Sequence, residues 1–130
     1  MNTDPRVRAA YAEGAGIYRI VPAAVALPQD TGDVVALVRQ AAESRMPLIP
    51  RGAGSGMAGG NVGSGTILDL SAGFSDLRID QHARRARAGA SVTWSQLNEA
   101  AKPYGLRLPP DPSSGLFATC GGMVATNAAG

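Results

Sequence analysis

The chain has 130 residues, of which 45% are hydrophobic and 17% are charged. This composition is typical of one folded domain and excludes a disordered or fibrous protein. No apolar run approaches the roughly 20 residues of a membrane-spanning helix, so we expect no transmembrane segment. The N-terminal residues lack the apolar core of a signal peptide, and a cytoplasmic protein is therefore the default expectation.

Charge and side-chain counts narrow the function classes further. The net charge is +2, but eleven of the twelve basic residues are arginines spread along the chain without interleaved aromatic residues, so we expect no nucleic-acid partner. The single cysteine, Cys120, excludes an internal disulfide. The single histidine, His82, excludes ordinary zinc clusters and histidine-based catalytic triads. We predict no metal site and no catalytic residue in this chain.

The first half of the chain predicts a short arm followed by a strand, a helix and a strand. Residues 1–17 form the arm, with a helical pattern over Arg6–Ala12. The apolar run Ala23–Leu27 predicts a buried strand, Thr31 is the expected cap of the next helix, and residues 47–50 predict the second strand. The apolar stripe of the helix consists of Val34, Leu37, Val38, Ala41 and Ala42. This order is typical of a right-handed βαβ unit with parallel strands.

The second half predicts mainly antiparallel structure. Residues 66–71 form a further strand, and residues 77–80 and 85–90 form a hairpin. Thr93 and Gln96 have the spacing of a capping box, which opens a helix that ends at Gly105. Residues 106–110 predict a strand, and only turns are expected after it. The expected fold class is α+β: a βαβ subdomain followed by the start of a second, mostly antiparallel subdomain.

Glycine is the most informative residue type. Seven of the 17 glycines lie between Gly52 and Gly65, directly after a predicted strand. Such a loop brings consecutive backbone N–H groups together in a nest that suits a phosphate. The GxGxxG spacing of this loop does not indicate a Rossmann fold, because GGNVGSG cannot continue as a helix. A phosphate-binding P-loop is excluded because the only lysine is Lys102, so a flexible surface loop is the remaining alternative.

A second region has similar chemistry. Residues 110–114 and 119–127 again offer hydroxyl groups, an amide and glycines that allow close approach. Two such regions in one small domain predict a long ligand that is held between them.

Three motifs in order, PRGAGSGMAGG, PPDPSS and ATCGGMVATNAAG, resemble the FAD-binding domain (PCMH type) of the vanillyl-alcohol oxidase/p-cresol methylhydroxylase flavoprotein superfamily. The branch that contains the flavoprotein component of glycolate oxidase and FAD-linked D-lactate dehydrogenase is the most similar. The resemblance covers residues 18–130, which we expect to be an FAD-binding domain that is incomplete at its C-terminus. Ser55, Cys120 and Ala129 depart from the family's usual residues.

The resemblance implies non-covalent FAD, with its diphosphate in the first loop and its remainder against the later motifs. The cofactor-binding residues that it implies are Arg51, Gly52, Ala53, Gly54, Ser55, Gly56, Gly59, Gly60, Pro110, Asp111, Ser113, Thr119, Gly121, Gly122, Thr126 and Asn127. Some relatives attach FAD through a histidine, but His82 is expected in an exposed turn. For Arg51, a phosphate contact and a structural salt bridge remain equally open.

The parent protein implied by the resemblance is an FAD-dependent oxidoreductase that oxidises a 2-hydroxy acid by hydride transfer to flavin N5. Its substrate would bind in a separate domain outside these residues, so the chain alone is expected to be inactive, and the sequence does not identify the electron acceptor. Two alternatives remain: a non-catalytic nucleotide- or phosphate-binding module, and a truncated, inactive remnant.

Three further side chains receive structural interpretations. Asp69 is expected to accept hydrogen bonds in a turn or cap, and Trp94 is expected to pack. Cys120 is expected to be a small buried hydrophobic residue, because the sequence offers no neighbouring base to lower its pKa.

Overall fold

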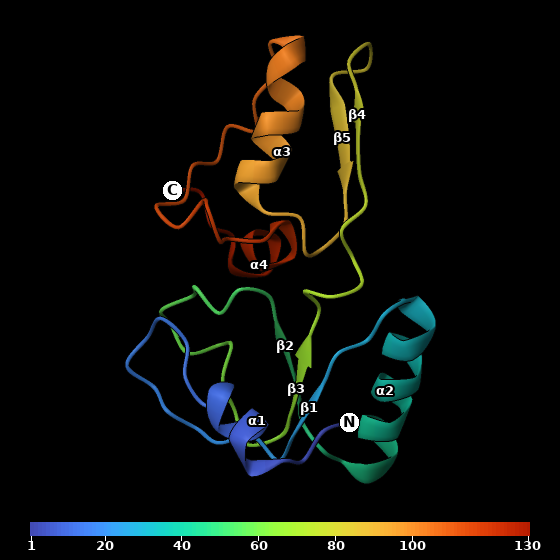
Figure 1. The fold of residues 1–130 in the computed structure, drawn as a ribbon, viewed down its shortest axis with the longest axis vertical. Coiled ribbons are helices and arrows are strands. Elements are labelled where there is room, and N and C mark those ends of the chain that lie inside the picture. The colour runs from blue at the N-terminus through green and yellow to red at the C-terminus, as the bar shows by residue number, and fades with distance from the viewer.

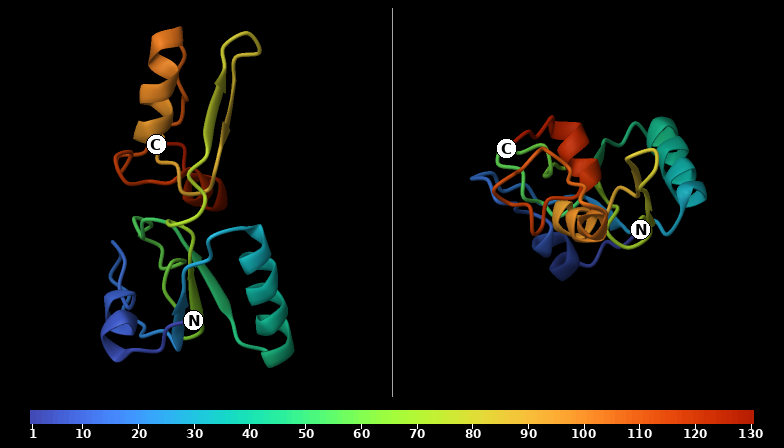
Figure 2. Two further views of the ribbon diagram at one scale, coloured as in Figure 1. Left: turned by 45° about the vertical axis from the view of Figure 1, so that its right-hand side comes forward. Right: turned by 90° about the horizontal axis from the view of Figure 1, so that it is seen from above.

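The computed structural model describes residues 1–130, and its elements fall into two halves (Figure 1). The first half contains α1 (Pro5–Ala10), β1 (Ala24–Ala26), α2 (Thr31–Ser44), β2 (Leu48–Arg51) and β3 (Thr66–Asp69). The second contains β4 (Leu77–Asp80), β5 (Arg85–Ala88), α3 (Trp94–Ala101), a 3₁₀ turn (Lys102–Tyr104) and α4 (Cys120–Thr126). Figures 1 and 2 show α4 at the junction, facing the loop that follows β2. No helix is long and apolar enough to cross a bilayer.

The first half is built on a parallel sheet with the strand order β1-β3-β2. Val25 of β1 and Ile49 of β2 both pair with Ile67 of the central strand, and Val25 and Ile67 are fully buried. Helices α1 and α2 lie on either side of this sheet (Figures 1 and 2). The predicted βαβ unit is therefore confirmed, with β3 inserted between its two strands.

The cap of α2 differs from the prediction. The helix begins at Thr31, and the carboxylate of Asp30 accepts a hydrogen bond from the backbone N–H of Asp33 at 2.9 Å. A carboxylate at this position satisfies a free N–H group and also interacts favourably with the helix dipole. Asp30, and not Thr31, is therefore the N-cap.

The second half contains the predicted hairpin and capped helix. Strands β4 and β5 pair antiparallel, with Leu77 opposite Ala88. The capping box is present in full: the Thr93 hydroxyl accepts from the Gln96 N–H at 3.1 Å, and the Gln96 side chain accepts from the Thr93 N–H at 2.9 Å. Leu97 is buried on the inner face of α3.

The strand predicted for residues 106–110 is absent. This segment instead follows α3, because the Leu108 N–H donates to the side chain of Asn98 at 2.9 Å and the Leu106 N–H donates to the Ala101 carbonyl. Pro109 and Pro110, the last two residues of this segment, have no N–H group that could pair with a strand in a sheet. Hydrogen bonds to α3 thus replace those of a strand.

Helix α4 was not expected, since Gly121 and Gly122 disfavour a helix. Three contacts compensate for this cost. The Thr119 hydroxyl accepts from the Gly122 N–H, while the N–H groups of Cys120 and Gly121 donate to the carbonyls of Val92 and Ala90. These carbonyls come from a segment that is distant in the sequence, so local propensity could not reveal them. The prediction of turns alone was wrong here.

Candidate functional site

The glycine-rich loop after β2 leaves its backbone N–H groups free. The carbonyl of Gly54 accepts hydrogen bonds from the Ala15 N–H and from the Asn61 side chain, both at 3.0 Å, and the carbonyl of Gly56 accepts from Asn61 at 2.9 Å. In contrast, no backbone N–H from residue 52 to residue 60 donates to an acceptor in the protein. Two of the loop's carbonyl groups are therefore engaged, while the donors remain available for a ligand.

The outer side of this loop is open. A Cβ atom placed on Gly60 would meet nothing within 4 Å, and one on Gly56 would meet only the Asn61 side chain, at 3.5 Å. Gly54 and Gly59 have φ values of 72° and 80°, a conformation that other residues rarely adopt. Free N–H groups, open space and left-handed glycines together form a cradle that fits an anion such as a phosphate.

Arg51 lies on the carbonyl side of the loop. Its guanidinium donates to the carbonyls of Glu13 at 2.8 Å, Asn61 at 3.3 Å and Tyr11 at 3.4 Å, and it lies 5.3 Å from the centre of the Tyr11 ring. No carboxylate forms an ion pair with it. The sequence left a phosphate contact and a salt bridge open for Arg51, whereas its partners in the structure are backbone carbonyls of the N-terminal arm and of the loop itself.

The arm is also tied to the sheet through Tyr11. Its hydroxyl donates to Asp69 at 2.5 Å, and Asp69 also accepts from the Ser71 N–H at 2.8 Å. Three effects raise the pKa of Tyr11 to about 12: the largest is its burial, the next is its hydrogen bond to Asp69, and the third is the negative charge of Asp69. Asp69 is therefore a structural acceptor, as predicted. The role of residues 11–15 beside the loop was missed, because their partners lie some 40 or more residues further along the chain.

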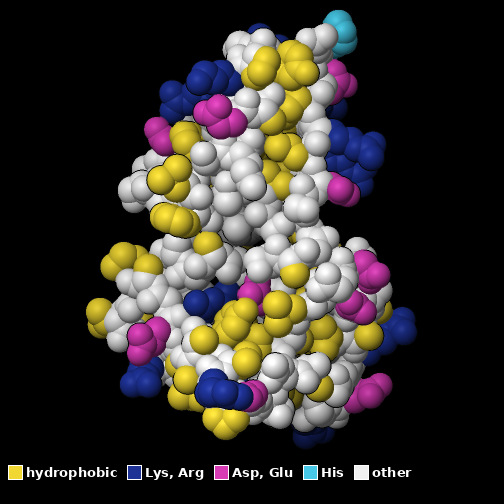
Figure 3. Space-filling model, in the orientation of Figure 1, with side chains coloured by type: hydrophobic (Ala, Val, Ile, Leu, Met, Phe, Trp, Pro, Cys, Tyr) yellow, Lys and Arg dark blue, Asp and Glu magenta, His cyan; other side chains and the backbone are white.

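The first and third motifs meet at Gly52 and Thr119. A Cβ atom on Gly52 would overlap the Thr119 hydroxyl oxygen, so the absence of a side chain allows this close approach. Thr119 is buried and caps α4. The space-filling view shows the molecule narrowing between its two halves (Figure 3). Two regions that are distant in the sequence thus converge, as the sequence analysis expected.

The second and third motifs also lie side by side. The N–H of Asp111 donates to the Ala129 carbonyl at 3.0 Å, while the Asp111 carboxylate forms an exposed ion pair with Arg107 at 3.3 Å. The Pro110 carbonyl accepts from the Trp94 indole, and Ser113 is exposed. The Trp94 ring lies against Gly115, which agrees with the predicted packing role.

The remaining residues of the third motif form α4 and its C-terminal end, and several of their polar groups already have hydrogen-bond partners in the protein. The Gly121 and Gly122 N–H groups are used at the start of the helix, and the Thr126 hydroxyl donates to the Gly122 carbonyl at 2.8 Å. Asn127 ends the helix in a left-handed conformation. Cys120 is half-buried, and this burial raises the pKa of its thiol, which disfavours the reactive thiolate.

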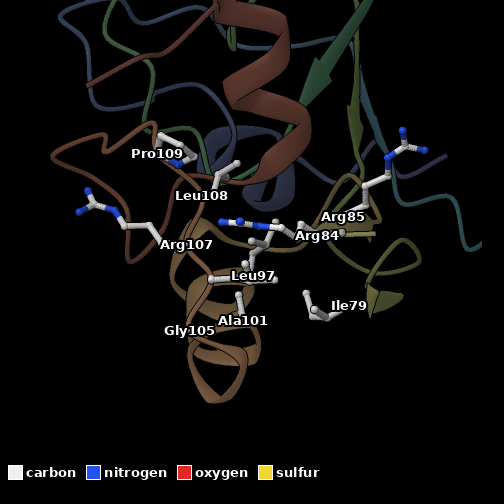
Figure 4. Close-up of a pocket in the computed structure, with 11 residues that line it drawn as sticks. Ile79, Arg84, Arg85, Leu97, Ala101, Gly105, Arg107, Leu108 and Pro109 are labelled. Atoms are coloured by element: carbon white, nitrogen blue, oxygen red, sulfur yellow. The ribbon is translucent and has the colours of Figure 1, made fainter. Parts of the chain in front are cut away.

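A pocket lies elsewhere, between the hairpin and α3 (Figure 4). Its volume is about 620 Å³, and Ile79, Leu97 and Leu108 contribute to an apolar lining beside Arg84. None of the residues predicted to bind the cofactor lines it. His82 lies in the exposed turn between β4 and β5. Figure 1 shows this turn at the end of the hairpin away from α4. The candidate site is thus defined by free backbone donors rather than by this pocket.

Three curated proteins illustrate the similarity to known sequences. The chain is 38% identical over 118 residues to a D-2-hydroxyglutarate dehydrogenase of Pantoea ananatis, with 88% of this chain and 12% of that protein covered. It is 40% identical over 108 residues to a D-lactate dehydrogenase of Archaeoglobus fulgidus, covering 82% and 24%. The glycolate oxidase protein GlcD of Escherichia coli is 33% identical over 132 residues, covering 100% and 26%. The chain therefore spans about a quarter or less of these relatives.

Solved structures show the same fold at lower identity. An alkyldihydroxyacetonephosphate synthase superposes with a TM-score of 0.82 at 23% identity, covering 99% of this chain and 27% of that one. A cholesterol oxidase from Brevibacterium sterolicum superposes with a TM-score of 0.70 at 24% identity, covering 82% and 21%. These similarities confirm the α+β fold class. Residues 22–130 match the FAD binding domain family, so the chain belongs to this family and the expected cofactor, FAD, is confirmed.

Proposed function

We propose that this chain binds FAD without a covalent bond and that residues 52–60 hold the diphosphate of the cofactor. The observation that carries this proposal is the continuous run of N–H groups without a protein acceptor. Because a phosphate is rich in acceptor oxygens, such donors are suited to it. The open space at Gly60 and the left-handed conformations of Gly54 and Gly59 fit the same ligand.

The proposed site extends from this loop across the contact between Gly52 and Thr119. The second motif lies beside the end of the third through Asp111 and Ala129, which supports a ligand that reaches from the loop toward both. The proposed cofactor residues are those implied by the sequence: Arg51–Gly56, Gly59, Gly60, Pro110, Asp111, Ser113, Thr119, Gly121, Gly122, Thr126 and Asn127. The position of His82 in the exposed hairpin turn supports non-covalent binding.

For the whole protein we propose an oxidoreductase that acts on a 2-hydroxy acid. D-Lactate, glycolate and D-2-hydroxyglutarate, the compounds in the names of the relatives, each carry a hydroxyl group beside a carboxylate. The chemistry that bound FAD supplies is acceptance of the α-hydrogen as hydride at N5. The residues of this chain bind and orient the cofactor. We propose that the base comes from a substrate domain. Within this chain, the raised pKa values of Tyr11 and Cys120 keep both residues protonated at neutral pH, so neither is suited to be that base.

Reconstitution of the purified protein with FAD tests the cofactor proposal. We expect yellow protein whose flavin absorption co-elutes in gel filtration and is released on denaturation. Protein that stays colourless but binds ADP would instead be a nucleotide- or phosphate-binding module. Protein that folds and binds neither ligand would be an inactive remnant. Either of these results would contradict the proposal.

The substrate proposal needs the full-length flavoprotein. Under anaerobic conditions, glycolate, D-lactate or D-2-hydroxyglutarate should bleach the yellow flavin absorption, while the same acids without the 2-hydroxyl group should not. A flavoprotein that none of these hydroxy acids reduces would contradict the proposed substrate class and leave the FAD site intact.

A further inference from the structure

The peptide groups of the glycine-rich loop need contacts with other residues to fix their direction. Glycine has more backbone freedom than any other residue, so a loop with this composition does not fix the direction of its N–H groups by itself. Peptide groups are planar and trans, and the carbonyl and N–H of one peptide group therefore point in opposite directions. A contact that fixes a carbonyl on one side of the loop also fixes the next residue's N–H toward the other side.

Asn61 makes two such contacts with one side chain. Its amide nitrogen donates to the carbonyls of Gly54 and Gly56 at 3.0 and 2.9 Å. Since both partners are acceptors, only the NH₂ group of Asn61 can face them. These two carbonyls belong to the peptide groups that contain the N–H groups of Ser55 and Met57. Asn61 thus directs these two donors away from itself.

The Asn61 side chain is held in turn by the arm and by Arg51. The backbone carbonyl of Asn61 accepts from the Arg51 guanidinium at 3.3 Å. Gly14 leaves no room beside the Asn61 amide, since a Cβ atom there would lie 2.6 Å from its oxygen. The Ala15 N–H adds a second donor to the Gly54 carbonyl. Asn61 is therefore fixed by its contacts with Arg51 and the loop and by the close approach of Gly14.

We propose that Asn61 is the positioning residue for diphosphate binding, acting through the peptide groups that precede Ser55 and Met57. This inference rests on the proposed function, because it names how the FAD site is shaped. Asn61 itself does not touch the cofactor. The affinity for any ligand with a diphosphate then depends on the donor character of this one side chain.

The test compares Asn61→Asp with Asn61→Ala and with the control Gln81→Glu. Asn61→Asp has nearly the same shape but cannot donate when ionised and repels both carbonyls, while Gln81→Glu makes the same charge change in the exposed hairpin turn. We expect Asn61→Asp to weaken both FAD and ADP by about 10- to 100-fold, which corresponds to the loss of one or two well-placed hydrogen bonds. Asn61→Ala should weaken both ligands less, and Gln81→Glu should bind as the unchanged protein does.

The thermal midpoint of each ligand-free variant separates positioning from folding. The proposal requires weaker binding by variants that remain folded at the temperature of the titration. It is overturned if Asn61→Asp and Asn61→Ala bind FAD and ADP as the unchanged protein does. It is also overturned if the loss follows the unfolded fraction alone and disappears on cooling. If the unchanged protein binds neither ligand, the proposed FAD site fails, and this inference fails with it.

Discussion

Two glycine-containing segments of this chain differ in whether their backbone N–H groups have hydrogen-bond partners. In residues 52–60 the glycines stay in a loop whose N–H groups have no protein acceptor. In α4, Gly121 and Gly122 enter a helix, and their N–H groups bond to the Ala90 carbonyl and to the Thr119 hydroxyl. The same residue type thus produces a set of free donors in one place and a closed structural element in the other.

The difference lies in what each segment meets. In the loop, carbonyl groups accept hydrogen bonds from side-chain and backbone donors. In α4, by contrast, N–H groups donate hydrogen bonds to the carbonyls of another segment. Glycine content alone therefore does not identify a phosphate site. The direction in which the peptide groups are held decides whether a segment can bind an anion.

The largest expected effect is that of Gly54→Val. A branched side chain is strained at a φ of 72°, and its Cβ atom would lie 2.7 Å from the Arg51 guanidinium. We expect FAD binding to fall by more than about 100-fold and the free energy of unfolding to fall by about 1–3 kcal/mol. Gly60→Ala is the control for stability, because its Cβ atom meets nothing within 4 Å. Wild-type affinity in Gly54→Val would contradict the loop assignment.

Gly52→Ala tests the contact between the loop and the start of α4. The added Cβ atom would overlap the Thr119 hydroxyl oxygen, so we expect a loss of about 1–3 kcal/mol in urea unfolding. In a Thr119→Ala background that oxygen is gone, and the same change should cost less. Equal costs in both backgrounds would show that the two segments are not in contact.

Thr119→Ala alone should have a smaller effect. It removes the N-cap of α4, which accepts from the Gly122 N–H at 3.2 Å, and a lost cap of this kind costs about 1 kcal/mol. Thr119→Ser keeps the hydroxyl and should recover most of the stability. If serine is no better than alanine, the cap does not hold the helix.

The smallest effect is expected at high pH. The pKa of Tyr11 rises from 10.0 to about 12 on folding, so the folded state retains this proton more tightly than the unfolded state does. The associated stabilisation is complete below pH 10 and is lost as the pH rises through about 12. Urea unfolding from about pH 9 to about pH 12 should therefore show a shallower decline for Tyr11→Phe. An unchanged decline would exclude Tyr11 as its source.

The sequence predicts much of the fold because its strongest signals are local. The apolar periods and the Thr93–Gln96 capping box identify the βαβ unit, the hairpin and α3, all of which the structure contains. Helix α4 and the path of residues 106–110 were mispredicted, because each depends on acceptors in other elements. A propensity rule in which glycine ends a helix takes no account of the hydrogen bonds that α4 makes to the carbonyls of Ala90 and Val92.

Part of the candidate site was likewise predictable from the sequence. Three ordered motifs indicated converging regions, and the contact of Gly52 with Thr119 has this character. The roles of Asn61 and of the arm were missed, because an asparagine at the end of a run of glycines is typical of an ordinary turn. The one signal in the sequence was a lone amide side chain at the end of the glycine-rich loop.

The most direct test of the account is an amide ¹H–¹⁵N spectrum of the protein titrated with ADP and then with FAD. The account predicts that the resonances of residues 52–60, and those of Ser55 and Met57 above all, shift as their N–H groups bind the diphosphate. On addition of ADP, which lacks the part of FAD proposed to lie against the later motifs, the N–H groups of Cys120, Gly121 and Gly122, which already have partners, should move far less. Binding that shifts the α4 resonances and leaves residues 52–60 unchanged would contradict it.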